Sequence, residues 1–328
     1  MGVGNAATHT DKKVIRRKWK WNRNGTVLRK TKYALLGKEA DQGLLFKLFI
    51  YVILIDTAYI YLNPLFFMIS TMVKDASDLV DPAVNWVPRV IYLGTLQEAW
   101  VMLDYAKSFF LSTGLTLAIA ASQTLLCAVA GYAFARLEFP LKTFWMFCLL
   151  LTFIVPPQLT ILPMLLAASE LGWINKLYPL LLPALFGHGL KGALFVIIFR
   201  QFFGTQPKDL EEAARIDGAN VFKVFYKVML PLARPAIIVV FLFSFVWNWN
   251  DSYYPGMYLI NAQDVPLSLG MSKISAGIEA RIAENGPTVF DEPIKMATSF
   301  LMILPPLVLY MFTQRYFVEG VERTGLVE

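Results

Sequence analysis

Six long apolar stretches run through this chain of 328 residues, and they constrain its fold more than any other feature. A helix needs about 20 consecutive, mostly apolar residues to cross a lipid bilayer. The stretches that reach this length are approximately 44–72, 106–134, 143–168, 177–200, 236–260 and 294–313. Hydrophobic residues make up 56% of the sequence and charged residues only 16%, too few polar groups to cover a soluble globule of this size. The sequence therefore predicts an all-α polytopic membrane protein with six transmembrane helices.

The lysines and arginines predict how these spans are oriented. In the connectors, the termini and the ends of the apolar stretches, 21 of them lie on one side of the predicted spans and six on the other. Because basic residues accumulate in cytoplasmic loops, both termini are expected in the cytoplasm. Residues 1–43 would then form a basic cytoplasmic arm near anionic lipid headgroups, and residues 323–328 a short cytoplasmic tail. The net charge of +6 follows from this topology, so the sequence gives no reason to expect a nucleic-acid partner.

Residues 204–235, between the fourth and fifth stretches, predict a hairpin of two short amphipathic helices on the cytoplasmic side. Pro207 suits the first position of a helix, and the acidic residues after it suit the positive end of the helix dipole. Gly218 can adopt the left-handed conformation that ends this helix, and Asn220 can cap the next one. Residues at helical spacing form one face of the first helix: Leu210, Ala213, Ala214 and Asp217.

The same hairpin carries a family resemblance. Glu212-Ala213-Ala214, three residues, Gly218, nine residues, Val228, one residue and Leu230-Pro231 match the EAA motif of bacterial binding-protein-dependent ABC importers, with Val in place of the more usual Ile. Gln206-Pro-Lys-Asp-Leu and Arg215-Ile-Asp-Gly-Ala resemble, more narrowly, the MalG-type carbohydrate permeases of the maltose and multiple-sugar family. Residues 130–136 and 315–320 are also similar to that family, and the resemblance covers about residues 50–322.

This resemblance implies a fold, a function and a set of partners. The fold would be the MetI-like fold of type I ABC importer permeases, with residues 44–322 as the transmembrane domain. The function would be that of a permease subunit in an ATP-driven sugar importer of the bacterial or archaeal cytoplasmic membrane. The partners would be a second homologous permease, two copies of an ABC ATPase, and an extracytoplasmic sugar-binding protein. The long, polar third outer loop, about 261–293, would reach toward the binding protein.

The resemblance also implies that the hairpin couples the membrane helices to the ATPase. The expected roles are that Glu212 pairs with an arginine of the ATPase, Ala213 and Ala214 pack against it, Gly218 shapes the turn, and Leu230-Pro231 anchor the hairpin to the fifth span. The complete set of expected coupling residues is Glu212, Ala213, Ala214, Arg215, Asp217, Gly218, Leu230 and Pro231. The alternative is an amphipathic helix that only lies on lipid headgroups.

The chain shows no catalytic or metal site of its own. No Gly-x-x-x-x-Gly-Lys-Ser/Thr loop, whose backbone amides would hold nucleotide phosphates, occurs in the sequence. Its two histidines, His9 and His188, have no neighbours at ligand spacing, and Cys127 and Cys148 both lie in apolar runs. We therefore expect no enzyme activity, no metal and no cofactor in this subunit, with ATP and Mg²⁺ bound by the partner ATPase.

Polar residues inside the apolar stretches predict where a solute passes. Burying a polar group in a membrane costs free energy, so such residues usually have a functional role. The candidates are Asp56, Gln158, His188, Lys191, Trp247, Asn248, Trp249, Asn250 and Asp251. Lys191, near the middle of the fourth stretch, either pairs with Asp56 as a structural lock or offers donors to sugar hydroxyls or to an acidic sugar's carboxylate.

For residues 247–251, the choice lies between a sugar path and tryptophans at the membrane interface, with a helix break at Pro255. Gln158, after the Pro156-Pro157 break, either lines the path or makes a hydrogen bond between spans.

Three other functions stay open from the residues alone. The same architecture could import another solute, such as an amino acid. A secondary carrier could use Asp56 for proton coupling, although no inverted repeat is evident. A membrane enzyme acting on lipid-linked sugars could use the acidic residues of the hairpin, but their helical arrangement favours docking.

Overall fold

The computed structural model describes residues 43–189 and 191–325, and in these ranges all regular structure is helical. The α-helices are α2 (Leu44–Met72), α3 (Ala76–Val80), α4 (Gly94–Leu103), α5 (Tyr105–Arg136), α6 (Lys142–Ile154), α7 (Pro157–Glu170), α8 (Tyr178–Leu181), α9 (Gly192–Thr205), α10 (Asp209–Ile216), α11 (Val221–Val224), α12 (Leu230–Leu232), α13 (Arg234–Asn250), α14 (Tyr253–Tyr258), α15 (Gly270–Asn285) and α16 (Asp291–Gly325). Three short non-α turns join them: η1 (Ala184–Phe186), η2 (Phe225–Met229) and η3 (Leu267–Leu269). The predicted all-α class is confirmed.

Within the described residues, three helices are long and apolar enough to cross a membrane: α2, α5, and α16 as far as Arg315. They lie at the predicted stretches 44–72, 106–134 and 294–313, and α16 runs on to Gly325, beyond the predicted end of the transmembrane domain. The chain divides within α2 into two compact units, residues 1–65 and 66–328. The predicted basic arm lies outside the described residues except for Gly43, as do the last three residues of the predicted tail.

The third and fifth predicted spans are interrupted rather than continuous. Helices α6 and α7 meet at an angle of 96° around Pro156, where the missing amide and the fixed φ of proline end a helix. Helix α13 ends at Asn250, and α14 begins only at Tyr253. At its other end, α13 bends by 78° from the segment Val221–Leu232. If each bent pair counts as one span, the described residues contain up to five candidate spans.

The prediction of a continuous helix over 177–200 is wrong. Within this stretch, α8 and η1 precede residues 187–189 and 191, which are not helical, and α9 starts at Gly192. Gly187, Gly189 and Lys191 all have positive φ, of 71°, 123° and 61°, which no α-helix accommodates. Lys191 therefore lies at the N-cap of α9 and not in mid-helix.

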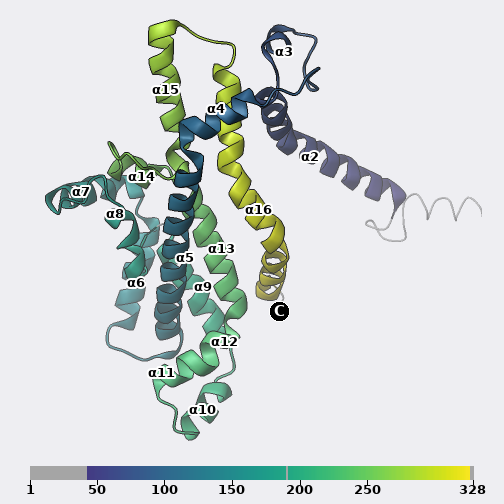
Figure 1. The fold of residues 1–328 in the computed structure, drawn as a ribbon. Coiled ribbons are helices and arrows are strands. Elements are labelled where there is room, and N and C mark those ends of the chain that lie inside the picture. The colour runs from purple at the N-terminus through teal and green to yellow at the C-terminus, as the bar shows by residue number, and fades with distance from the viewer. Residues whose placement is uncertain (1–42, 190, 326–328) are drawn as a thin grey trace, which may run out of the picture. The chain divides into compact units, whose positions relative to one another are not determined.

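Helix α5 is the central element of the second unit, because it packs along both α9 and α13 (Figure 1). Its buried face consists largely of small residues, and several hydroxyls on it bond to carbonyl groups of the preceding turn, so their polarity is satisfied within the helix. At Gly131 an added β-carbon would lie 2.4 Å from the Phe199 side chain and 2.9 Å from the backbone nitrogen of Arg200. Glycine is required there because α5 and α9 approach so closely.

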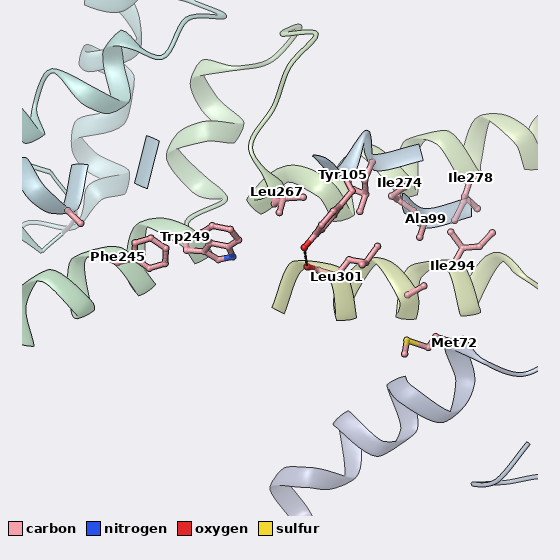
Figure 2. Packing of buried hydrophobic residues seen from close by; sticks show 13 residues of the cluster. Met72, Ala99, Tyr105, Phe245, Trp249, Leu267, Ile274, Ile278, Ile294 and Leu301 are labelled. Atoms are coloured by element: carbon pink, nitrogen blue, oxygen red, sulfur yellow. Dashed lines mark hydrogen bonds between the residues drawn. The ribbon is translucent and has the colours of Figure 1, made fainter. Parts of the chain in front are cut away.

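Two apolar cores lie at opposite ends of this bundle. The first joins α4, α15 and α16 to the ends of α5 and α13, and Figure 2 shows the Tyr105 hydroxyl donating to the Leu301 carbonyl oxygen within it, at 3.1 Å. The second joins α5, α9 and α13 to the hairpin helices, around Phe199, Phe203 and Met229. Figure 1 shows α10 and α11 at the end of α5 that is remote from α4 and α15.

The third outer loop, predicted as a long polar connector, contains the 16-residue helix α15. Ile274 and Ile278, one turn apart, are buried against α4 and α16. Arg281 forms ion pairs with Glu98 of α4, at 2.8 Å, and with Asp291 at the start of α16. Two apolar residues at helical spacing, together with these charges, make the segment a packed helix and not a floppy loop.

Candidate functional site

The hairpin at residues 204–235 has the predicted helix–turn–helix form. Gly218 takes a φ of +80° directly after α10, and the side chain of Asn220 accepts a hydrogen bond from the Lys223 amide at the start of α11, at 2.9 Å. Both features confirm the predicted turn and cap. Pro207 lies two residues ahead of α10, whose first residue is Asp209, so the predicted start of this helix was slightly early.

A buried ion pair ties the hairpin to α5. The Glu211 carboxylate lies 3.1 Å from the guanidinium nitrogen Nε of Arg136, and both side chains are more than nine-tenths buried. The Tyr132 hydroxyl donates to Glu211 at 3.4 Å, and Arg136 also donates to the Gln206 carbonyl oxygen. Arg215 lies 3.7 Å from the same carboxylate. The first turn of α10 is thus fixed to the last turn of α5.

Sequence reasoning missed this role of Glu211. It treated Glu211 as one of several acidic residues that suit the helix dipole or could serve a membrane enzyme. It used Arg136 for the orientation of the chain and as part of the family resemblance at residues 130–136. Two signals were available: Arg136 ends the second apolar stretch, and Glu211 lies in the connector between the fourth and fifth stretches. They do not by themselves indicate a contact, because 74 residues separate the two positions.

Glu212 projects away from the bundle. It is exposed, as are Ala213, Arg215, Asp217 and Gly218, whereas Ala214 is half-buried against the second core. Large apolar side chains of the same hairpin are exposed as well: Ile216 is 86% exposed, Phe222 83% and Tyr226 69%. Such apolar side chains around charged ones are typical of a protein interface. The expected pairing of Glu212 with an arginine of a partner stays a prediction.

The hairpin is joined to α13 through a tightly packed junction. Met229 and Ala233 are fully buried, and Leu230 packs against the same core, while Pro231 is exposed. Between Val221–Leu232 and Arg234–Asn250 the axis turns by 78°. The hairpin is therefore attached to α13 through packed side chains, and to α5 through the Arg136–Glu211 pair.

Two neighbouring cavities lie beside the interrupted fourth stretch. The smaller, of about 50 Å³, is lined by Gln123, Asn248 and Asp251 among others. The larger, of about 520 Å³, is lined by Lys191, by the α6–α7 break and by the start of α9. His188, Gly189 and Tyr254 line both, so the two spaces adjoin. The structure thus places His188 and Lys191 in the wall of the larger cavity. It places His188, Asn248 and Asp251 in the wall of the smaller one.

The two tryptophans of the fifth stretch belong to the packing between helices. Trp249 is 4% exposed, and its indole N–H donates to the Met302 carbonyl oxygen at 3.1 Å. Trp247 is half-buried and stacks on Phe195 and Phe243, with centroid separations of 5.6 and 5.2 Å. Neither indole lines the two cavities described above, and the predicted role of these tryptophans in a sugar path stays a prediction.

The polar residues beside these tryptophans have different surroundings. Asn248 donates to the Ser244 carbonyl oxygen at 2.8 Å and lines the small cavity. Asp251 accepts from the backbone amides of Tyr253 and Tyr254, at 2.9 and 3.4 Å, and so caps α14. Asn250 is exposed and donates to the Val246 carbonyl oxygen at 2.8 Å. Asn248 and Asp251 are the members of this cluster that line a cavity.

Gln123, which the sequence reasoning overlooked, connects these elements. It is fully buried in α5, and its side-chain oxygen accepts from the Ser244 hydroxyl at 2.5 Å and from Asn248 at 3.4 Å. Its amide group donates to the His188 carbonyl oxygen at 3.5 Å. The available signal was the polar run Ser122-Gln123-Thr124 inside an apolar stretch. Gln123 fixes α13 and the non-helical residues 187–189 to α5.

Two further candidates lie apart from these cavities. Gln158, the second residue of α7, is exposed and lines neither cavity. Asp56 is exposed in α2 and belongs to the first compact unit, so its predicted pairing with Lys191 stays a prediction. Among the described residues, no group of three or more His, Cys, Asp and Glu side chains comes together in a way that could hold a metal ion.

Comparisons with known proteins place this geometry in context. The family model described as "Binding-protein-dependent transport system inner membrane component" matches residues 124–323. The chain is 28% identical, over 280 residues, to the sn-glycerol-3-phosphate transport system permease protein UgpE of Pectobacterium atrosepticum, covering 83% of this chain and 95% of that protein. It is 30% identical, over 284 residues, to the osmoprotective compounds uptake permease protein GgtD of Synechocystis, covering 84% and 90%.

A solved structure shares the fold. A chain of a bacterial ABC transporter involved in the import of the acidic polysaccharide alginate superposes with a TM-score of 0.70 at 20% sequence identity. The match covers 85% of this chain and 98% of the other. The interrupted spans and the hairpin therefore occur within an arrangement already known from an ABC importer.

Proposed function

This chain belongs to the family of binding-protein-dependent transport system inner membrane components, and from that premise we propose that it forms half of the translocation pathway of an ATP-driven sugar importer. The family is that of the membrane component, so ATP hydrolysis and solute capture belong to an ATPase and a binding protein. The MalG-type residues around the hairpin support a sugar as the solute. The name of UgpE, a permease for sn-glycerol-3-phosphate, also supports a small polyhydroxylated solute.

The proposed assembly contains this chain, a second homologous permease, two copies of the ATPase that bind ATP and Mg²⁺, and an extracytoplasmic sugar-binding protein. It lies in the cytoplasmic membrane of a bacterium or archaeon. This chain crosses that membrane six times with both termini inside, as its lysine and arginine bias favours. The fourth span, between α7 and the hairpin, is then also a broken one, made of α8, η1 and α9. Broken spans are tolerated where they are buried in protein or line a cavity.

The observation that carries this proposal is the exposed face of the hairpin, on the side away from α5 and α13. Its partner-facing group combines the Glu212 carboxylate with the apolar side chains of Ile216 and Phe222, which cover no part of this chain. Such a face fits an apolar cleft with an arginine at its base, because a carboxylate and a guanidinium form strong, directional hydrogen bonds. The hairpin docks in that cleft of the ATPase.

Transport follows from how the hairpin is held. ATP draws the two ATPase copies together, and each hairpin moves with the ATPase on which it is docked. The Arg136–Glu211 pair and the Met229 packing pass this movement to α5 and α13, whose side chains Gln123 and Asn248 line the small cavity. The cavity then opens alternately to the two sides of the membrane, and no covalent chemistry takes place in this subunit.

The test is to replace Glu212 by alanine in the reconstituted complex and to measure binding-protein-dependent sugar uptake and ATPase copurification. We expect both to fall about tenfold, the usual result of losing a buried charge pair at an interface. Glu138→Ala is the matched control, because Glu138 is an exposed acidic residue on the connector that follows α5, close to its Arg136 end. Unchanged uptake with Glu212→Ala, or sugar uptake driven by a proton gradient without the ATPase, would contradict the proposal.

A further inference from the structure

Lys191 occupies an unusual backbone position. Its φ of +61° lies in the left-handed region that side chains other than glycine, asparagine and aspartate rarely adopt. Its neighbours Gly187 and Gly189 also have positive φ, so the local chain already uses glycine where it needs this freedom. A lysine in such a position is strained, and strain of this kind is characteristic of functional sites. The strained position of Lys191 therefore indicates that its side chain has a function.

The cavity that Lys191 lines is large and has no negative charge of its own. Its volume of about 520 Å³ is in the range of small-molecule sites. None of its lining residues is Asp or Glu, whereas His188 and Lys191 both belong to it. In the described part of the chain, Lys191 takes part in no ion pair. An uncompensated cation in a membrane segment is costly, which favours an anionic partner from outside the chain.

The start of α9 also suits an anion at the same place. Lys191 is the N-cap of this 14-residue helix, and the positive end of the helix dipole therefore lies at the cavity wall. Asp251, a carboxylate that lines the adjoining small cavity, accepts hydrogen bonds from the amides of Tyr253 and Tyr254. Asp251 is thus already engaged with α14 and leaves Lys191 free to bind a solute.

We propose that this cavity binds the anionic group of the transported solute, with Lys191 as the residue that selects an acidic sugar over a neutral one. The inference rests on the proposed import function and adds the charge class of the solute. The shared chemistry is a single anionic group on a polyhydroxylated compound, either a carboxylate as in a uronic acid or a phosphate ester. The Tyr254 ring, which lines both cavities, lies beside the path from this site toward Asn248.

The experiment measures ATP-dependent uptake by the complete complex, reconstituted in liposomes with its binding protein in excess. The probes are a uronic acid oligosaccharide, a sugar phosphate and a neutral oligosaccharide of the same length as the first. Lys191→Met removes the charge at similar length, and Lys191→Arg keeps it. Lys176→Met is the matched control, since Lys176 is an exposed lysine that precedes α8 and lines neither cavity.

We expect the wild-type complex to transport one of the two anionic probes in preference to the neutral one, and the preferred probe identifies the anionic group. In Lys191→Met the ratio of anionic to neutral uptake should fall about tenfold or more, the usual effect of losing a charge-assisted hydrogen bond. Lys191→Arg should keep most of the preference and Lys176→Met all of it.

Other results would overturn this inference in distinguishable ways. Wild-type uptake that prefers the neutral probe, or an equal loss of all uptake in Lys191→Met, would reject the anion site and leave the import function standing. Recovery of uptake when Asp56→Asn accompanies Lys191→Met would assign the lysine to a structural ion pair instead. A complex that shows no ATP-dependent uptake of any saccharide would reject the proposed function itself.

Discussion

The buried pair of Arg136 and Glu211 offers a quantitative test of how the hairpin is attached. Replacing Glu211 by leucine leaves the Arg136 guanidinium, 5% exposed, without an ionic partner among the described residues. Removing one member of a buried pair costs about 3–5 kcal/mol, because the remaining charge stays desolvated. We therefore expect Glu211→Leu to lower the free energy of unfolding by about this amount.

The reverse substitution should cost less. In Arg136→Met the Glu211 carboxylate keeps the Tyr132 hydroxyl at 3.4 Å and the half-exposed Arg215 at 3.7 Å. These contacts compensate part of the charge, so we expect a loss of roughly half as much, about 2 kcal/mol. The double variant replaces the pair by two apolar side chains of similar size and should lose only about 1 kcal/mol or less.

The assay is equilibrium unfolding of the purified subunit in mixed micelles, with the four proteins of this double-mutant cycle measured under one set of conditions. The expected signature is strong non-additivity, with the double variant more stable than Glu211→Leu alone. Two single losses that simply add, or two losses below about 0.5 kcal/mol, would show that the pair is not buried and coupled as described here.

The remaining predictions concern backbone conformation and titration. Gly131→Ala should destabilise the protein by about 1–3 kcal/mol, since the added β-carbon would lie 2.4 Å from a side chain of α9. The control is Gly114→Ala in the same helix, whose added β-carbon meets nothing within 4 Å and which should be neutral or stabilising. Thermal unfolding of the two variants measures the difference. Gly218→Ala should weaken the hairpin by about 1 kcal/mol, because its φ is +80°, and faster proteolysis between α10 and α11 would reveal it. In the loop after α3, the amide of Ala83 donates to Asp81 and lowers the pKa of that carboxyl below its ordinary 3.8, with the Arg89 side chain adding to the effect. A lowered pKa in the folded state gives stability that is present above the unfolded pKa of 3.8 and is lost as the pH falls through the folded pKa. The protection factor of the Ala83 amide against hydrogen exchange should therefore fall in that acid range and stay constant between about pH 5 and 8.

The sequence alone predicted the features that depend on neighbouring residues. The apolar stretches 44–72 and 106–134 correspond to α2 and α5, with boundaries that agree within two residues. A long apolar segment forms a helix because lipid offers its backbone N–H and C=O groups no other hydrogen-bond partners. Gly218 and Asn220 ended and began their helices as expected, since a left-handed turn and an N-cap are local devices.

Other features depended on contacts between distant parts of the chain. Glu211 and Glu212 are adjacent and identical in type, yet one is buried and the other exposed. Nothing near them in the sequence distinguishes the two. Only the position of Arg136, at the end of a helix 75 residues before Glu211, decides which glutamate faces inward.

The interrupted fourth stretch has a similar origin. Its composition is that of a continuous span, but Gln123 of α5 donates to the His188 carbonyl oxygen and accepts from the Ser244 hydroxyl of α13, which gives the unwound backbone at 187–189 a partner. Trp249, a pathway candidate from the sequence, donates to the Met302 carbonyl oxygen of α16 and is buried. Local sequence therefore determined which segments became helices. Tertiary packing decided where these helices break and which polar side chains face a cavity, because burial and hydrogen-bond pairing depend on contacts between residues far apart in the chain.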